Sequence, residues 1–249
     1  MQLKKSLGQH FLIDRQWIDR IMEVLMQDKQ ARILEVGPGG GALTQQLLEL
    51  KEVTFKAVEV DDEKVDFLKK KFSSLADNLI HTSFLDMAAP FDQPFTLIGN
   101  FPYNISTEIL FKVLEWKDLV PTVIGMFQKE VAQRVAAVPG SKMYGVTSAL
   151  IQPYYEIEYL FDVPPDAFLP PPKVVSGVIR MKRKTSGLQL RSERDYRNLV
   201  KTAFNQRRKK LRNAVRGLFA PEVLQDPIFD QRAEQLSIQE FAQLTYRMI

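Results

Sequence analysis

The sequence predicts an α/β fold in which a mainly parallel sheet has helices on both faces and is followed by a small all-helical domain. Two observations predict it. Short apolar runs alternate with amphipathic segments up to about residue 182, and beyond a polar linker at residues 184–189 only helical periodicity is present. The expected strands are residues 32–36, 54–60, 79–82, 95–99, 123–127, 155–161 and 174–181. Because a proline-rich loop without a helix joins the last two strands, we expect them to form an antiparallel hairpin at the sheet edge.

Helices are expected where apolar residues recur three or four positions apart. This spacing predicts helices at residues 42–50, 63–73, 107–116 and 129–138. Beyond the linker it predicts a helix through Tyr196 and Phe204 and a second helix through Leu211 that includes the basic residues from Arg207 onward. A last helix begins at Ser237-Ile-Gln-Glu240, which has the spacing of a capping box. We therefore expect two domains, residues 1–183 and residues 184–249.

The charge of the chain is distributed unevenly. Of the 249 residues, 45% are hydrophobic, which is enough for a sizeable core, and the formal net charge is +4. The segment from Arg180 to Arg216 has a charge of +12, however, so the rest of the chain has a charge of −8. A segment this basic indicates a polyanionic partner, either nucleic acid or an anionic membrane surface, although an ordinary solvated helix face can have the same composition.

The residues that the chain lacks exclude several classes of site. There is no cysteine, so disulfides, thiolate zinc sites and cysteine nucleophiles are excluded. The two histidines, His10 and His81, do not have a metal-ligand spacing, and we expect no metal site. No targeting segment is evident, and no run of about 18 apolar residues is present. We therefore expect a soluble, cytoplasmic protein.

The strongest local signal is a glycine turn between the first expected strand and the helix after it, in Ile33-Leu-Glu-Val-Gly-Pro-Gly-Gly-Gly-Ala-Leu-Thr44. Glycines let the backbone turn sharply and approach a flat ligand closely. Glu59, 22 residues after Gly37, ends the second expected strand, where a carboxylate can accept hydrogen bonds from ribose hydroxyls. Together these features predict a nucleoside-cofactor site, whereas the glycines alone would also fit a structural turn.

The identity of the cofactor depends on the glycine spacing and on later strands. The turn lacks the third glycine of the dinucleotide fingerprint. Asp86 follows the third expected strand, where a carboxylate can accept a hydrogen bond from an adenine amine, although aspartate is also common in turns and helix caps. These features favour S-adenosylmethionine.

Asn100-Phe-Pro-Tyr103, at the end of the fourth expected strand, has the groups needed to methylate an amine on a planar base. The lone pair of such an amine is delocalised into the ring, so the site needs two acceptors for the amine hydrogens and an aromatic face for the base. Asn100 offers a side-chain oxygen, Pro102 a backbone carbonyl and Tyr103 a ring. No general base is required, because the amine can lose its proton after attack. A turn that merely ends a strand is the alternative.

In this order, the glycine turn, Glu59, Asp86 and Asn100-Phe-Pro-Tyr103 resemble the ribosomal RNA adenine N6-dimethyltransferases. More distant stretches resemble the KsgA branch of that family, which dimethylates two adjacent adenosines near the 3′ end of 16S rRNA. These stretches are Lys5-Ser-Leu-Gly-Gln-His-Phe-Leu12, Gln128-Lys-Glu-Val-Ala-Gln-Arg134, Ser141-Lys-Met-Tyr-Gly145, Val163-Pro-Pro-Asp-Ala-Phe-Leu-Pro-Pro-Pro-Lys-Val174 and Phe204-Asn-Gln-Arg-Arg-Lys-Lys-Leu-Arg-Asn213. The resemblance covers nearly the whole chain and implies a Rossmann-like class I S-adenosylmethionine-dependent methyltransferase fold.

The resemblance also implies roles for individual residues. It assigns contacts with S-adenosylmethionine to His10, Leu12, Gly37, Glu59, Asp86 and Asn100. It assigns the target base to Asn100, the Pro102 carbonyl, Tyr103 and Phe168, with Phe168 closing the second face of the base unless it is a core residue. It places rRNA contacts in the helical domain at Arg207, Arg208, Lys209, Lys210 and Arg212. The implied partner is 16S rRNA within the immature 30S subunit, bound by a monomer.

Three residues depart from the usual pattern of the family. His10 replaces the common Asn, Phe101 replaces Leu, and Gly40 replaces a larger residue, which we expect to loosen the glycine turn. Three alternative functions stay open. They are a large-subunit rRNA methyltransferase of the erythromycin-resistance type, a non-catalytic nucleic-acid-binding protein with a methyltransferase fold, and a DNA adenine methyltransferase.

Overall fold

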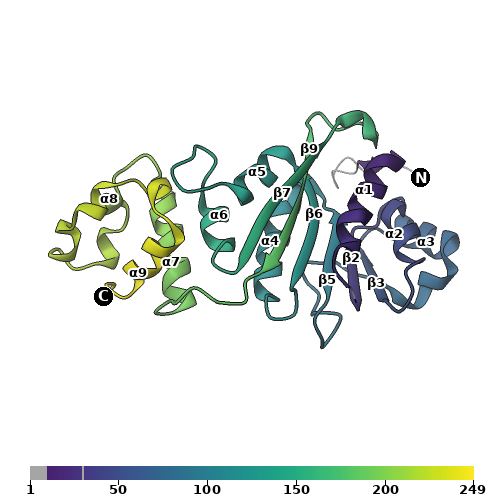
Figure 1. The fold of residues 1–249 in the computed structure, drawn as a ribbon, viewed down its shortest axis with the longest axis horizontal. Helices are drawn as coiled ribbons and strands as arrows, with labels where there is room; N and C mark the ends of the chain where they lie inside the picture. Colours follow the sequence, from purple (N-terminus) through teal and green to yellow (C-terminus); the bar gives the residue numbers. More distant parts are fainter. Residues whose placement is uncertain (1–9, 30) are drawn as a thin grey trace. The chain divides into compact units, whose positions relative to one another are not determined.

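A seven-stranded sheet forms the centre of the fold in the computed structural model, which describes residues 10–29 and 31–249 (Figure 1). The strands lie in the order β4-β3-β2-β5-β6-β9-β7. They are β2 (Arg32–Val36), β3 (Thr54–Glu59), β4 (Leu79–His81), β5 (Thr96–Asn100), β6 (Thr122–Gln128), β7 (Tyr155–Val163) and β9 (Ser176–Arg183). The pairs from β4 to β6 are parallel, and β9 pairs antiparallel with β6. The predicted mainly parallel sheet and its antiparallel edge are confirmed.

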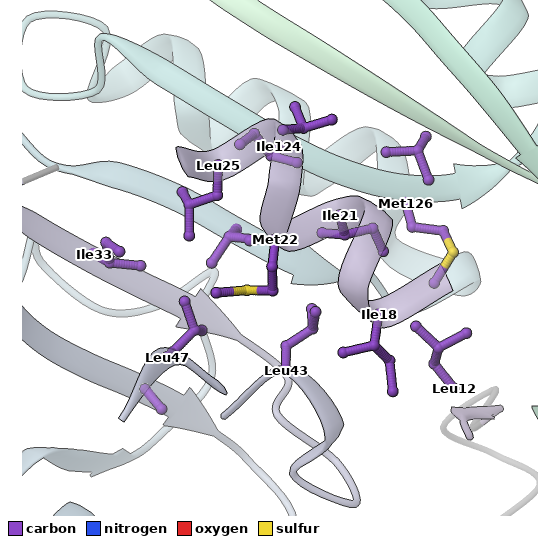
Figure 2. Close-up of a cluster of buried hydrophobic side chains, with 14 of the residues drawn as sticks. Leu12, Ile18, Ile21, Met22, Leu25, Ile33, Leu43, Leu47, Ile124 and Met126 are labelled. Carbon is purple, nitrogen blue, oxygen red and sulfur yellow. The ribbon is translucent and has the colours of Figure 1, made fainter. Parts of the chain in front are cut away.

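Three helices cover one face of this sheet. They are α1 (Arg15–Met26), α2 (Ala42–Leu47) and α3 (Asp62–Lys71). Their apolar side chains form one cluster with every second residue of the central strands, such as Ile33 of β2 and Ile124 of β6. Figure 2 shows the α1 and α2 members of this cluster gathered around Ile33 and Ile124. The helix α4 (Ser106–Glu115) lies on the other side of the sheet (Figure 1).

The helix α1 was not among the predicted elements, although its sequence has the apolar spacing and the capping residue of a helix. Ile18, Ile21, Met22 and Leu25 are buried and spaced three or four residues apart, and Asp14 caps the helix by accepting a hydrogen bond from the Gln16 amide at 2.9 Å. This helix follows the short strand β1 (Phe11–Leu12), which pairs antiparallel with β8 (Phe168–Leu169) in the proline-rich loop.

The glycine turn between β2 and α2 contains three left-handed residues, Gly37, Gly39 and Gly41. A Cβ atom on Gly41 would collide with the ring of Phe72. Gly40 differs from its neighbours, because its φ lies outside the left-handed region and a Cβ atom there would meet Phe11 at an ordinary 3.7 Å. The left-handed residues beside Gly40 set the conformation of the turn, and the expectation that Gly40 loosens it stays a prediction.

The chain packs as two compact units, one with the described residues up to Ala132 and Glu158–Arg183, the other with Gln133–Ile157 and Lys184–Ile249. The second unit is helical, with α6 (Val146–Ile151), α7 (Glu193–Asn205), α8 (Leu211–Ala214) and α9 (Ile238–Thr245). The predicted boundary at residue 184 coincides with one boundary of these units, while residues 133–157 pack with the C-terminal residues. The hydroxyl of Tyr196 in α7 donates to the Ala149 carbonyl in α6 at 2.8 Å.

Two predictions about the second unit have different outcomes. The capping box at the start of α9 is confirmed, because Ser237 and Glu240 exchange hydrogen bonds between side chain and backbone. The placement of Arg207–Lys210 on a helix is wrong, because α7 ends at Asn205 and α8 begins at Leu211. The physical reason is that residues 205–210 are all polar and offer no apolar side chain that a helix could bury.

Within the described part of the chain, none of the helices combines the length and the apolar composition that crossing a bilayer requires.

The glycine turn generates a prediction on stability. Gly40→Ala should raise the free energy of unfolding by about 0.5 kcal/mol, because the backbone of this residue suits an L-amino acid and alanine restricts the unfolded chain. Gly41→Ala, the matched control, should lower it by about 2 kcal/mol, because its φ of 79° is strained for alanine and its Cβ would meet Phe72. Denaturant unfolding measures both changes. Equal losses in the free energy of unfolding for the two variants would contradict the conclusion that the backbone of Gly40 suits an L-amino acid and that of Gly41 does not.

Candidate active site

The site residues meet at the carboxyl ends of the parallel strands, where ligands bind in open α/β sheets. A cavity of about 260 Å³ lies there. Its walls come from the end of β1, the glycine turn after β2, the end of β3, the loop after β4 and the end of β5. Segments that are far apart in the sequence therefore form one binding site.

Glu59 joins the end of β3 to the glycine turn. Its side chain is only 5% exposed, and its Oε2 accepts a hydrogen bond from the Gly39 amide at 3.3 Å. Its Oε1 accepts from the amides of Val60 at 3.0 Å and Asp61 at 3.1 Å. The Nζ of Lys64 lies 4.0 Å from Oε2. These partners hold the carboxylate in one orientation on the cavity wall.

Glu35 is a second acid on this cavity, and it was not among the predicted site residues. Its side chain is 2% exposed, and its Oε2 accepts a hydrogen bond from the Thr44 hydroxyl at 2.7 Å. Burial raises the pKa of Glu35 to about 8, and the nearby charge of Glu59 acts in the same direction, while the hydrogen bond from Thr44 opposes both. The sequence signal was a glutamate within the apolar strand β2, where an unpaired charge is costly.

Asn100, at the end of β5, has its amide oriented by the N-terminal segment. Its Nδ2 donates to the backbone carbonyl of His10 at 2.9 Å. Because the nitrogen is used in this bond, the Oδ1 atom is the end of the amide that can accept a hydrogen bond from a ligand in the cavity. The role of Asn100 in holding a target amine stays a prediction, with which this orientation of the amide is compatible.

Tyr103 is half-buried on the cavity wall and held at two places. Its hydroxyl forms a hydrogen bond of 2.6 Å with the hydroxyl of Ser176. Its ring stacks on the His10 ring, with 5.7 Å between the ring centroids and 29° between the planes. Burial raises the pKa of Tyr103, and the bond to Ser176 opposes this in part.

His10 contacts the proline-rich loop as well as Asn100 and Tyr103. Its Nδ1 lies 2.8 Å from the carbonyl oxygen of Pro170, and because a carbonyl can only accept, Nδ1 bears the hydrogen. His10 and Leu12 both line the cavity, and Leu12 pairs with Phe168 across β1 and β8. The first motif of the sequence comparison began at Lys5, and residues 5–9 lie outside the described residues.

Comparison with known proteins decides the family. The family model described as "Ribosomal RNA adenine dimethylase" matches residues 1–248. The chain belongs to this family. It is 51% identical to a ribosomal RNA small subunit methyltransferase A of Cytophaga hutchinsonii, with 98% of this chain and 96% of that protein covered. It is 49% identical to a protein of the same name from Phocaeicola vulgatus, with 97% and 88% covered.

Two solved structures share the fold of this chain. A dimethyladenosine transferase from Plasmodium falciparum has a TM-score of 0.78 at 21% identity, with 96% of this chain and 99% of that chain covered. The 23S rRNA methyltransferase ErmE has a TM-score of 0.75 at 24% identity, with the same coverage. The predicted class I methyltransferase fold is confirmed for this dimethylase family member.

Not every residue that the family resemblance implied lies on the cavity. Gly37, Pro102 and Tyr103 line it together with Glu59 and Asn100. Asp86 is exposed in a turn closed by its amide on the Ser83 carbonyl at 3.2 Å, and Ser83 and Leu85 line the cavity instead. Phe168 is 2% exposed and belongs to the hydrophobic cluster with Leu12. The proposed contacts of Asp86 with the cofactor and of Phe168 with the base stay predictions.

The pKa of Glu35 generates a prediction on stability. Between its ordinary value of 4.5 and about 8, the folded chain keeps a proton that the unfolded chain has lost. The contribution of Glu35 is therefore complete below pH 4.5, and the free energy of unfolding falls as pH rises toward 8, by at most about 1.4 kcal/mol per pH unit. Glu35→Gln removes this titration, so the wild type should lose stability relative to the variant over this range.

Chemical unfolding of the ligand-free proteins at several pH values between 5 and 8 measures this difference. Glu49→Gln, which changes an exposed glutamate after α2, is the matched control and should follow the wild type at every pH. Parallel stability curves for the wild type and Glu35→Gln would show that Glu35 is ionised throughout.

Proposed function

We propose that this chain transfers methyl groups from S-adenosylmethionine to the N6 amines of two adjacent adenosines near the 3′ end of 16S rRNA, in the immature 30S subunit. The observation that supports this most directly is the Asn100 amide, whose Oδ1 is available at a cavity that also contains the Tyr103 ring. The names of the relatives at 51% and 49% identity support the choice of the small subunit.

The residues of the cavity fit S-adenosylmethionine. Glu59 is held by three backbone amides beside the glycine turn, where the remaining lone pair of Oε2 can accept from a ribose hydroxyl. Glu59 lines the cavity, and Glu35 is a second acid there, whose ionised form a nearby cationic ligand would favour. When bound, the cofactor supplies an electrophilic methyl group. No metal ion is part of the proposed chemistry.

The chain's own residues orient the target amine. The Oδ1 atom of Asn100 accepts one N6 hydrogen, and the Pro102 carbonyl accepts the second. In the structure that carbonyl receives the amide of Ile105 at 3.3 Å and the hydroxyl of Ser106 at 3.2 Å. Ser106 also reaches the Tyr103 carbonyl at 3.2 Å, so its hydroxyl can give up Pro102 without losing its hydrogen bond. Held in this way, the nitrogen lone pair is directed toward the methyl group.

The rate enhancement in this proposal comes from alignment and hydrogen bonding. The amine does not need to be deprotonated before attack, since its proton leaves afterwards. The target adenine has to leave its stack to enter the cavity, and the Tyr103 ring replaces part of the stacking that it loses. The proposal assigns this reaction to a monomer in the cytoplasm, because every residue that it uses belongs to one chain.

Asn100→Ala tests the function. Methyl transfer to small subunits that lack the modification should fall by at least about 100-fold, because one acceptor for the amine is lost. The measurement is mass identification of the methylated nucleosides. Asn78→Ala, in the turn before β4, is the control and should retain activity. Unchanged transfer by Asn100→Ala would contradict the mechanism, and methylation of the large subunit alone would contradict the substrate.

The basic residues of the second unit divide into two groups. Lys210 and Arg212 both pair with Asp230, at 2.8 and 2.7 Å, and they lower the pKa of Asp230. Arg207 donates to the Lys142 carbonyl at 2.6 Å. Arg208 and Lys209 are exposed, and within the described chain no carboxylate forms an ion pair with either. We infer that Arg208 and Lys209 contribute most to the contact with rRNA phosphates.

Salt dependence tests this division. Arg208→Ala and Lys209→Ala should each reduce the slope of log affinity against log salt by about 1, because each removes one phosphate contact. Lys210→Ala is the matched control and should change the slope less, because Asp230 already neutralises Lys210. Filter binding of a 16S rRNA fragment at several salt concentrations measures the slopes. If Lys210→Ala changed the slope more than Arg208→Ala and Lys209→Ala do, the conclusion that Arg208 and Lys209 contribute most to the phosphate contact would be wrong.

A further inference from the structure

The ring of Tyr103 can serve as a stacking platform only if both its position and its plane are fixed, and Ser176 is the residue that contacts its far end. The two hydroxyls lie 2.6 Å apart. The hydroxyl is the atom of tyrosine most distant from the backbone, so a hydrogen bond there fixes the position of the far end of the ring and with it the first side-chain torsion. The hydroxyl oxygen lies on the axis about which the ring turns, so the plane of the ring depends on contacts with its faces. In the motif itself, Tyr103 begins a short 3₁₀ turn directly after Pro102.

Ser176 is itself held rigidly. It is fully buried at the start of β9 and pairs with Gln128 of β6. The residue before it accepts a hydrogen bond from the Lys129 amide at 2.9 Å. At the residue after it, Gly177, a Cβ atom would lie 2.6 Å from the Tyr159 hydroxyl, so the strand fits closely against its neighbours. Because the strand cannot shift easily, the hydroxyl of Ser176 keeps a constant position for its hydrogen bond with Tyr103.

His10 holds the same ring from one of its faces. The two rings stack at 5.7 Å, and the imidazole is fixed by the bond from its Nδ1 to Pro170. The ring of Tyr103 is therefore restrained at its hydroxyl by Ser176 and on one face by His10. Because burial raises the pKa of Tyr103, the phenol remains protonated and can keep the hydrogen bond at neutral and moderately alkaline pH.

We propose that Ser176 is a positioning residue for methyl transfer, which acts through the Tyr103 hydroxyl to hold the ring at the position where the target adenine stacks on it. The proposal rests on the proposed function, since it needs a base in the cavity. The role of Ser176 is distinct from that of Asn100, because Asn100 lines the cavity and Ser176 is not among the residues that line it. Ser176 therefore acts on the base only through the position of Tyr103.

A double-mutant cycle tests the proposal. Ser176→Ala and Tyr103→Phe each remove one hydroxyl of the pair and keep the ring. Each should lower kcat for methyl transfer to unmodified small subunits by about 10-fold, because the ring loses its alignment. The double variant should be no slower than either single variant, since both changes remove the same hydrogen bond. The affinity for S-adenosylhomocysteine should not change in any of the three, and Ser176→Thr, which keeps a hydroxyl, should restore most of kcat.

Ser148→Ala controls for the loss of a buried serine. Ser148 is also fully buried and donates to the Arg134 carbonyl, but it lies in α6 of the second unit. It should lower the melting temperature without lowering kcat. If Ser176→Ala has the same kcat as the wild type, the inference about Ser176 is overturned. The proposed function is upheld in that case, because the wild type is active. Additive losses in the cycle would also overturn it, because Ser176 would then act independently of Tyr103. A wild type inactive on small subunits would instead overturn the proposed function.

Discussion

The parallel pairing of β2 with β3 on one side and β5 on the other is the constraint on which the site depends. In this register Val36 lies opposite Val58, and the Gly37 amide continues the ladder by donating to the Val58 carbonyl at 2.9 Å. The glycine turn, Glu59 and Asn100 therefore leave the sheet side by side. A slip of one residue would turn Glu35 away from the cavity and place an apolar side chain there. The hydrophobic cluster under α1 and α2 opposes such a slip, because Ile33 and Ile98 would leave it.

The two acids of the cavity show how their surroundings distinguish two chemically similar groups. Glu59 receives hydrogen bonds from three backbone amides, whereas the hydrogen bonds to Glu35 come from the hydroxyl and the backbone of Thr44. Burial and the charge of Glu59 raise the pKa of Glu35. A cationic ligand would reverse part of this effect, because an opposite charge nearby favours the ionised carboxylate. Without a ligand, Glu35 keeps its proton, so the two acids do not repel each other as two negative charges. Both acids can then be ionised when a cationic ligand binds.

Local patterns predicted the parts of the site that follow directly from strands. Apolar runs placed β2, β3 and β5, and so the residues at their ends, Glu59 and Asn100, were found from the sequence. Residues in loops were harder, because their positions depend on tertiary contacts that no short pattern encodes. Phe168 pairs with Leu12 through two-residue strands, which are too short to show periodicity. Glu35 escaped notice because a single polar residue in a buried strand does not disturb the apolar pattern that predicts the strand.

Two of the departures from the family pattern have local physical explanations. Phe101 is buried beside Phe127, and its ring occupies the space that side chains at Gly99 and Gly125 would need. The larger ring is thus accommodated by two glycines on adjacent strands. His10 keeps the function of its position that depends on the backbone, because its carbonyl orients Asn100 whatever the side chain. The imidazole ring also stacks on Tyr103, a contact that an asparagine side chain could not make because it has no ring. The Nδ1 atom of the imidazole donates a hydrogen bond to the Pro170 carbonyl in the proline-rich loop. The N-terminal segment therefore takes part in shaping the site: it sets the orientation of the amide that would hold the amine and restrains the ring that would hold the base.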